Sequence, residues 1–179
     1  MPPNTVLIFA HPYPDRSRAN RALLAAVSDL PHVDVRSLYD RYPDFAIDVD
    51  AEQQALLAAE RIVWQHPLYW YTVPSLLKHW FEKVLQRGWA YGSKGTQLHG
   101  KRCLWVVTAG GDQAAFSESG FHRHDFSAFV PVVKQTAQFC GMIWEPPIVV
   151  HGAHKISDVE LAEQARAYRG RLAGSGVEA

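Results

Sequence analysis

The sequence predicts an α/β protein in which one parallel sheet of five strands, in the order 2-1-3-4-5, carries helices on both faces. Two observations predict this class. Apolar runs rich in β-forming residues alternate with segments of helical periodicity along the chain. The length of 179 residues is enough for one sizeable domain and short for two. We therefore expect a single domain over 1–179, with flexible tails at 1–4 and 174–179.

The first part of the chain contains two expected strands and two expected helices. Residues 5–10 form a continuous apolar run, which is typical of a parallel strand buried on both faces. A helix is expected at 17–30, with Ser17 as its cap. Residues 33–38 alternate between apolar and polar, which predicts a more exposed strand. After a long loop, a short helix is expected at 51–60.

The middle of the chain carries the third and fourth expected strands. Residues 61–65 form a short apolar strand, and residues 102–108 form a longer one. Between them, 75–86 places leucine, tryptophan and phenylalanine at helical spacing. This spacing predicts an amphipathic helix that packs against the sheet or a partner subunit. A glycine-rich loop is expected at 87–100.

The last part of the chain repeats the alternation. A long loop leads to a helix expected at 126–140, and a fifth strand is expected at 142–150. The proline pair inside that strand indicates a sheet edge or a strand start, because proline cannot donate to a ladder. The final helix is expected at 157–172, where Ser157 and Glu160 have the spacing of a capping box.

The composition argues against several classes of protein. Eighteen basic and eighteen acidic residues cancel, so the basic excess of a nucleic-acid-binding surface is missing. Cys103 and Cys140 lie far apart and are expected as buried free thiols, which fits a reducing cytosol. The His122 and His124 pair lacks an acidic or cysteine partner at ligand spacing, so no metal is expected. The start of the chain lacks a signal or membrane span, and we expect a cytoplasmic protein.

Three loops follow the expected carboxyl ends of strands one, three and four, where open α/β sheets bind ligands. The first loop leads into Ser17-Arg18-Ala19-Asn20 at a helix start, where backbone N–H groups favour an anion. The second, 65–74, brings three aromatic residues between two prolines and offers a flat apolar platform. The third, Thr108-Ala109-Gly110-Gly111, lets backbone approach a ligand closely. A phosphate anchor, a platform and a glycine edge together fit flavin mononucleotide (FMN).

Two of the three loops also have a plainer interpretation. The first is also what an ordinary capped helix looks like, and the second is also what a buried core loop looks like. The sequence lacks the G-x-G-x-x-G and P-loop patterns, and Ser117 and Ser119 do not lie in a G-x-S-x-G elbow. Dinucleotide-binding Rossmann proteins, P-loop NTPases and α/β-hydrolases are therefore disfavoured.

Six segments together resemble the flavodoxin-fold NAD(P)H:quinone oxidoreductase family. Within it they are most similar to the ancillary subunits of bacterial glutathione-regulated potassium-efflux (Kef) systems. The resemblance covers nearly the whole chain, and its combination of motifs is specific. The segments are Ala10-His11-Pro12-Tyr13-Pro14, Ser17-x-Ala19-Asn20, Tyr42-Pro43-Asp44-Phe45, Gln65-His66-Pro67-Leu68, Trp89-Ala90-Tyr91-Gly92 and Thr108-x-Gly110-Gly111.

This resemblance implies a flavodoxin-like fold and a homodimer with FMN sites at the subunit interface. It implies hydride transfer from NAD(P)H to the flavin, followed by two-electron reduction of a quinone. Residues implied at the ribityl-phosphate end are His11, Ser17, Arg18, Ala19 and Asn20. Those implied at the ring are Leu68, Tyr69, Trp70 and Tyr71 on one side and Thr108, Ala109, Gly110 and Gly111 on the other.

The resemblance also suggests residues at the substrate side. Larger family members carry a tyrosine and a histidine after the glycine pair; here these positions fall on Phe116 and His122. The hydroxyl is missing, which leaves His122 as the ionisable candidate for a catalytic role, with Phe116 beside it. Trp89 and Tyr91 are implied to reach the substrate side of the neighbouring subunit's site. The chain is shorter than FAD-binding members of the family, which favours FMN over FAD.

A second hypothesis is of a different class. The chain would act mainly as a regulatory subunit that binds a Kef-type potassium/proton antiporter, with secondary redox activity. That function would place it peripherally on the inner face of the cell membrane. An electron-transfer flavodoxin is less well supported, because such proteins are usually strongly acidic and this chain has no formal net charge.

Overall fold

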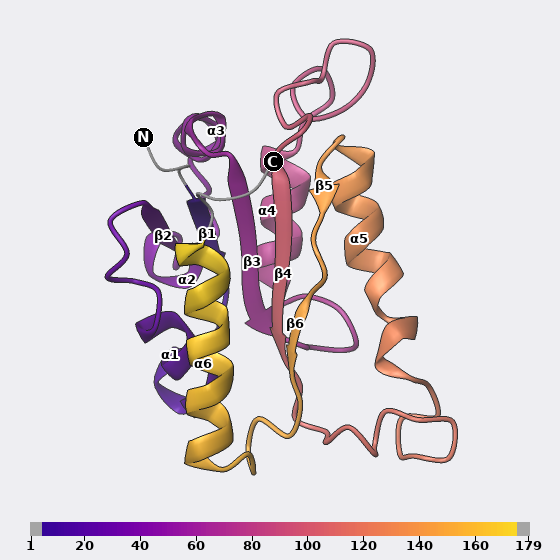
Figure 1. The fold of residues 1–179 in the computed structure, drawn as a ribbon. Coiled ribbons are helices and arrows are strands. Elements are labelled where there is room, and N and C mark those ends of the chain that lie inside the picture. Colours follow the sequence, from indigo (N-terminus) through magenta and orange to yellow (C-terminus); the bar gives the residue numbers. More distant parts are fainter. Residues whose placement is uncertain (1–4, 175–179) are drawn as a thin grey trace.

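The structure is a computed structural model that describes residues 5–174 (Figure 1), so the expected tails lie outside the described residues, apart from residue 174. It contains a parallel sheet in the order β2-β1-β3-β4-β5, with β6 also pairing with β4. The predicted fold class and strand order are therefore confirmed. The strands are β1 (Thr5–Phe9), β2 (Val33–Ser37), β3 (Arg61–Pro67), β4 (Arg102–Thr108), β5 (Ile143–Trp144) and β6 (Ile148–Val150).

The fifth predicted strand is wrong in one respect, because it is two short strands. β5 pairs with the start of β4 and β6 pairs with its end. Pro146 and Pro147 lie between them and have no N–H group to donate to the ladder. The expectation of a sheet edge is confirmed. Glu145, just before the prolines, forms ion pairs with Arg61 at 2.9 Å and Arg171 at 2.8 Å.

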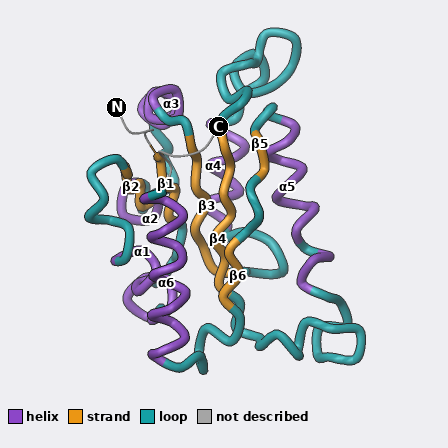
Figure 2. Tube along the Cα trace, in the orientation of Figure 1, coloured by secondary structure: helices purple, strands orange, loops and turns teal. Residues whose placement is uncertain are grey.

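Helices cover both faces of the sheet (Figures 1 and 2). The helices α1 and α6 pack together on one face, and α2, α3, α4 and α5 contribute to the core on the other. The helices are α1 (Arg18–Ala25), α2 (Leu38–Arg41), α3 (Val49–Ala58), α4 (Ser75–Val84), α5 (Val130–Phe139) and α6 (Asp158–Ala173), with 3-10 turns at Pro14–Arg16 and Phe126–Ala128. Among residues 5–174, none of these helices combines the length and apolar character needed to cross a membrane.

Most of the predicted helices are confirmed, with two corrections. The first ends at Ala25, although it was expected to continue to residue 30. The short helix α2 lies where a loop was expected. Both serine caps are confirmed: the Ser17 hydroxyl accepts from the Asn20 N–H at 3.2 Å, and Ser157 forms the capping box with Glu160.

The core consists of two apolar clusters, one on each face of the sheet. Every residue of β1 and β3 is buried, which explains the continuous apolar run at the start of the chain. Trp64, Trp80 and Trp105 are fully buried on the face covered by α4, so the expected packing of that helix against the sheet is confirmed. Cys103 and Cys140 are buried free thiols, as expected.

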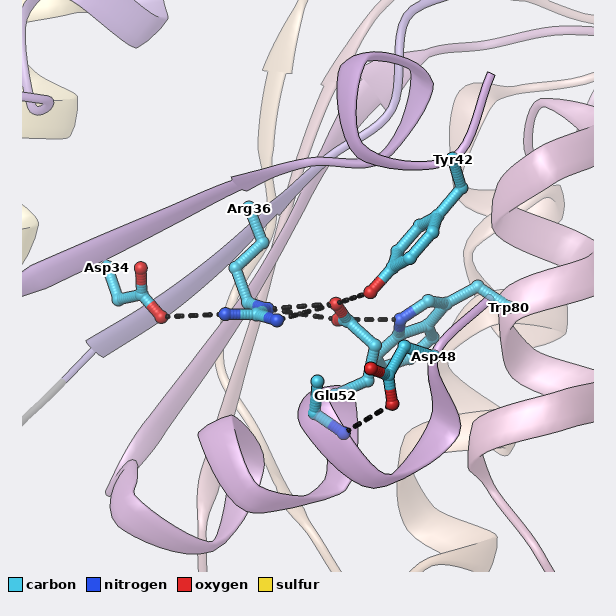
Figure 3. Close-up of polar contacts among 7 residues, drawn as sticks. Asp34, Arg36, Tyr42, Asp48, Glu52 and Trp80 are labelled. Carbon is cyan, nitrogen blue, oxygen red and sulfur yellow. Dashed lines mark hydrogen bonds and ion pairs between the residues drawn. The ribbon is translucent and has the colours of Figure 1, made fainter. Parts of the chain in front are cut away.

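A buried ionic cluster joins β2, α2, α3 and α4 (Figure 3). The fully buried Glu52 carboxylate accepts hydrogen bonds from Arg36 at 2.7, 3.0 and 3.1 Å. It also accepts from the Tyr42 hydroxyl at 2.7 Å and the Trp80 indole N–H at 3.0 Å. Burial alone would raise the pKa of Glu52, but these donors outweigh burial and lower its pKa. No sequence pattern predicted this cluster.

Candidate functional site

The loops after β1, β3 and β4 meet at one edge of the sheet, where the strands end (Figure 1). The three strands are neighbours and parallel, so their carboxyl ends coincide. The backbone continues the pairing beyond the strands: the Ala10 N–H donates to the Gln65 carbonyl at 3.0 Å, and the Leu68 N–H donates to the Thr108 carbonyl at 2.8 Å. This edge is the switch point of the 2-1-3-4-5 order, where such sheets bind ligands.

Asn20 connects α1 to the strands β3 and β4 beneath the loop that follows β1. Its side chain is fully buried, and its amide donates to the Thr108 hydroxyl at 2.7 Å and the Ser17 hydroxyl at 3.2 Å. The backbone carbonyl of Asn20 accepts from the Gln65 side chain at 3.1 Å. Asn20 and the buried Ala19 therefore fix the position of the α1 N-terminus against β3 and β4.

A cavity of about 520 Å³ opens beside this helix start. Leu68, Tyr69, Thr108 and Gly110 form its far side, and Ser17 and Arg18 lie at the helix start. His11 is buried at its edge, and its Nδ1 accepts from the Tyr13 N–H at 3.0 Å. Burial lowers the pKa of His11, which favours the neutral imidazole.

Arg18 is partly engaged elsewhere. Its guanidinium pairs with the Asp158 carboxylate and donates to the Ile156 carbonyl, which ties α1 to the segment that starts α6. The charge expected to face a phosphate is therefore shared with α6, although Arg18 still lines the cavity. Arg16 lies over the Tyr13 ring at 5.3 Å and lines the same cavity.

The aromatic loop after β3 has an unusual backbone. Trp70 and Tyr71 both adopt the left-handed conformation, with φ of 49° and 62°, which non-glycine residues rarely do. The Thr72 N–H closes the turn by donating to the Tyr69 carbonyl at 3.0 Å. Trp70 is 91% exposed and Tyr71 is 44% exposed, so the loop is not a buried core loop.

His66, near the end of β3, supports this loop from below. It is fully buried, and its Nε2 accepts from the Trp105 indole N–H at 2.7 Å. Its Nδ1 therefore carries the proton and donates to the Pro67 carbonyl at 2.8 Å. Burial lowers the pKa of His66 to about 4 and keeps the ring neutral.

A second cavity of about 270 Å³ continues from the first, sharing Leu68 and Gly110 with it. Trp70 and Tyr71 line one side, and Gly111 and His122 line the other. A Cβ atom on Gly111 would lie 2.8 Å from His122 Nε2, and one on Gly110 would lie 3.3 Å from the His154 ring. The absence of side chains at Gly110 and Gly111 therefore lets the rings of His154 and His122 approach the backbone closely.

Phe116 and His122 form the far wall of the second cavity. Their rings stack with centroids 4.2 Å apart, and Phe116 is buried. The Tyr71 hydroxyl lies 3.4 Å from His122 Nδ1. The structure therefore brings the catalytic candidate together with the predicted ring-binding residues.

A wider cavity of about 920 Å³ adjoins the glycine pair on the side of α6. Phe121, His151 and Lys155 line it, and the sequence did not mark these residues as part of a site. Phe121 lies in the long loop after β4, and His151 and Lys155 follow β6. These segments are far apart in the sequence, and only the fold brings them together beside Gly111.

Trp89 and Tyr91 are predicted site residues that lie away from these cavities in the single chain. Their loop lies at the end of the sheet where β4 begins (Figure 1). Tyr91 packs instead on Phe139 of α5, with ring centroids 4.9 Å apart. Their predicted contact with substrate depends on a second subunit and stays a prediction. The cavities are also not lined by three buried residues of the predicted site, Ala19, Asn20 and Ala109.

Comparisons with known proteins agree with this architecture. Residues 3–172 match a protein family described as having a flavodoxin-like fold. The chain is 50% identical over 167 residues to the glutathione-regulated potassium-efflux system ancillary protein KefF of Salmonella arizonae, covering 93% of this chain and 94% of that protein.

Solved structures are also similar. General stress protein 14 of Treponema denticola, in complex with FMN, superposes with a TM-score of 0.89 and 33% identity, covering 97% of this chain and 99% of the other. An NADPH-quinone reductase from P. pentosaceus gives a TM-score of 0.85 and 28% identity, covering 94% and 97%. The chain therefore belongs to the family with the flavodoxin-like fold, and within it the chain is similar to the KefF ancillary proteins and to an NADPH-quinone reductase.

Proposed function

We propose that this protein is an FMN-dependent oxidoreductase that transfers two electrons from NAD(P)H to a quinone. The observation that carries the proposal is the pair of connected cavities at the ends of β1, β3 and β4. One cavity begins at a helix N-terminus, and the other is flanked by aromatic rings and two glycines. A phosphate and a flat ring system joined by a short polyol match this arrangement.

The residues present fit FMN at both ends. At the phosphate end, the first N–H groups of α1 and the guanidinium groups of Arg16 and Arg18 favour an anion, the helix end by about 0.3–1 kcal/mol. At the ring end, Gly110 and Gly111 line the cavity without side chains, and a Cβ on Gly111 would lie 2.8 Å from His122 Nε2. The relative from Treponema denticola, which was solved with FMN, supports the choice of cofactor.

The overall reaction balances with one proton from solvent. NAD(P)H gives up a hydride, the quinone accepts two electrons and two protons in total, and the products are NAD(P)+ and a hydroquinone. FMN, when bound, supplies a ring that holds the two electrons between the two substrates. The protein would bind both substrates in turn at the cavity lined by Trp70 and Tyr71, where His122 would be available to a ligand oxygen that gains charge.

The first experiment is spectroscopic. The purified protein is expected to be yellow or to take up added FMN with quenching of its fluorescence. Anaerobic NADPH or NADH is expected to bleach the bound flavin, and a quinone to restore it. A colourless protein that binds no FMN would refute the proposal.

A pair of matched variants tests the phosphate end. Ser17→Ala removes the cap of α1, and Asp48→Ala removes the equivalent cap of α3, where Asp48 accepts from the Ala51 N–H at 3.0 Å. Each loses a helix cap, worth about 1 kcal/mol of stability. Only Ser17→Ala is expected to weaken FMN binding, by about tenfold, and its effect should vanish with riboflavin, which lacks the phosphate. Equal effects on FMN affinity would contradict this anchor.

We also propose that the protein is a homodimer that uses an apolar groove between α4 and α5. The groove has a volume of about 390 Å³ and is lined by Tyr91, Val132 and Phe139 among others. Val132 is 58% exposed and Phe139 is 61% exposed in the single chain. A second copy seated there would cover them and would bring the loop of Trp89 and Tyr91 into a subunit interface.

Light scattering after size exclusion tests the dimer. Phe139→Asp places a charge in the groove and is expected to yield a monomer. Val159→Asp is the matched control, because Val159 is 69% exposed on α6, on the opposite face of the sheet. A dimer that survives Phe139→Asp would exclude this groove as the interface.

A second function is supported by the relatives named as ancillary proteins of potassium-efflux systems. The protein would bind and activate a Kef-type antiporter at the inner face of the membrane. His122→Ala separates the two functions. If quinone reduction falls while potassium efflux from cells with the antiporter stays activated, binding alone carries the regulation.

A further inference from the structure

Tyr71 and His122 come from different loops and meet at the second cavity. The Tyr71 hydroxyl is 3.4 Å from His122 Nδ1, at the long end of the range for a hydrogen bond. The two rings meet edge to face at 81°, with centroids 5.6 Å apart. On its other side the imidazole stacks against Phe116, which has no polar group to offer.

The backbone holds Tyr71 in this place at some cost. Left-handed conformations at Trp70 and Tyr71 are unfavourable for aromatic residues, so the surrounding contacts must enforce them. The Tyr71 ring also stacks on Phe129, with centroids 5.2 Å apart and planes 24° from parallel. Tyr71 is therefore clamped between a strained turn and an aromatic partner, with its hydroxyl directed at the imidazole.

This contact has a consequence for the proton on the imidazole. A phenol hydroxyl donates readily, and a neutral imidazole accepts at one nitrogen only. If Nδ1 accepts from Tyr71, the ring proton lies on Nε2. Nε2 has no protein hydrogen-bond partner in residues 5–174, and it occupies the space beside Gly111 that a side chain would fill.

We infer that Tyr71 is a positioning residue that holds His122 in the tautomer with the proton on Nε2, so that His122 donates a hydrogen bond into the cavity beside Gly111. A donor there suits a ligand that carries an oxygen acceptor on a flat ring, such as a flavin or quinone carbonyl. The inference rests on the proposed function for the identity of that ligand. The tautomer itself depends only on the protein.

Histidine-ring NMR with 15N labelling tests the tautomer without cofactor or turnover. His122→Gln identifies the signals of His122 by their loss. For the neutral form of the His122 ring, the wild-type protein is expected to show the proton on Nε2, and Tyr71→Phe to show exchange between the two tautomers. Tyr39→Phe is the matched control, because its hydroxyl contacts Ser75 and the Leu76 N–H and lines none of these cavities. A wild-type ring protonated on Nδ1, or a Tyr71→Phe spectrum like wild type, would overturn the inference.

A double-mutant cycle tests whether the pair matters for the reaction. Tyr71→Phe is expected to slow quinone reduction roughly tenfold, the order expected for one hydrogen bond, with little change in FMN affinity. In the His122→Gln background the same substitution is expected to have no further effect. Additive effects of the two substitutions would contradict the coupling. Failure to bind FMN would refute the proposed function separately, because the NMR result would still report on Tyr71.

Discussion

Replacing Glu52 by glutamine removes a negative charge from the buried cluster of Figure 3 and keeps the size of the side chain. The NH2 group of glutamine cannot accept hydrogen bonds, and the one remaining oxygen cannot serve Arg36, Tyr42 and Trp80 together, so at least one buried donor loses its partner. Breaking a buried ion pair from one side costs about 3–5 kcal/mol. Arg36 keeps a second, more exposed partner, Asp34, at 3.3 Å, so we expect the lower end of that range. For a protein with a total stability of about 5–15 kcal/mol this is a large fraction.

Chemical denaturation at constant protein and flavin concentration measures the loss. Glu82→Gln is the control, since Glu82 forms an exposed pair with Lys78 on α4, and it is expected to have no measurable effect. The double variant Arg36→Met/Glu52→Leu is expected to be less destabilised than Glu52→Gln, because it leaves no buried charge unpaired. A cost below about 1 kcal/mol for Glu52→Gln would refute the reasoning, since even one unsatisfied buried group should cost that much.

Three further predictions concern the site and pH. The pKa of Glu52 is lowered in the folded protein, so the Glu52 carboxylate stabilises the fold fully above its unfolded pKa of about 4.3. This stabilisation is lost as the pH falls through the pKa of Glu52 in the folded protein. Denaturation at several pH values should therefore show that the difference in stability between wild type and Glu52→Gln narrows in acid. The pKa of His66 is lowered to about 4, so below about pH 6.5 the unfolded chain binds a proton at His66 that the folded protein does not. Wild type should therefore lose stability toward pH 4 more steeply than His66→Gln. Parallel stability curves for the two proteins would count against a buried neutral His66. Gly111→Ala should push against His122 and weaken FMN binding, whereas unchanged affinity in a fluorescence titration would show that the neighbours yield.

The fold followed from features that lie close together in the sequence. Strand β1 is one unbroken apolar run, and Ser17 and Ser157 stand directly before their helices. Such signals need only a few neighbouring residues, and the structure confirms them. The division of the last strand was missed because the two prolines were compatible with either an edge or a strand start.

Contacts between distant residues could not be predicted in the same way. Glu52 stands in the first turn of α3 beside Asp50, where acidic residues are usually exposed, and its burial depends on Arg36, Tyr42 and Trp80 from other parts of the chain. The approach of Tyr71 to His122 depends on left-handed backbone at two aromatic residues, which propensity argues against.

The proline pair between β5 and β6 also affects how copies of this protein can associate. An uninterrupted edge strand exposes a row of N–H and C=O groups on which another chain can build a strand, and such growth leads to aggregation. Here β5 has two residues, β6 has three, and the segment between them includes two positions that cannot donate. Sheet extension at this edge is therefore blocked, and association there is left to side-chain surfaces such as the groove between α4 and α5.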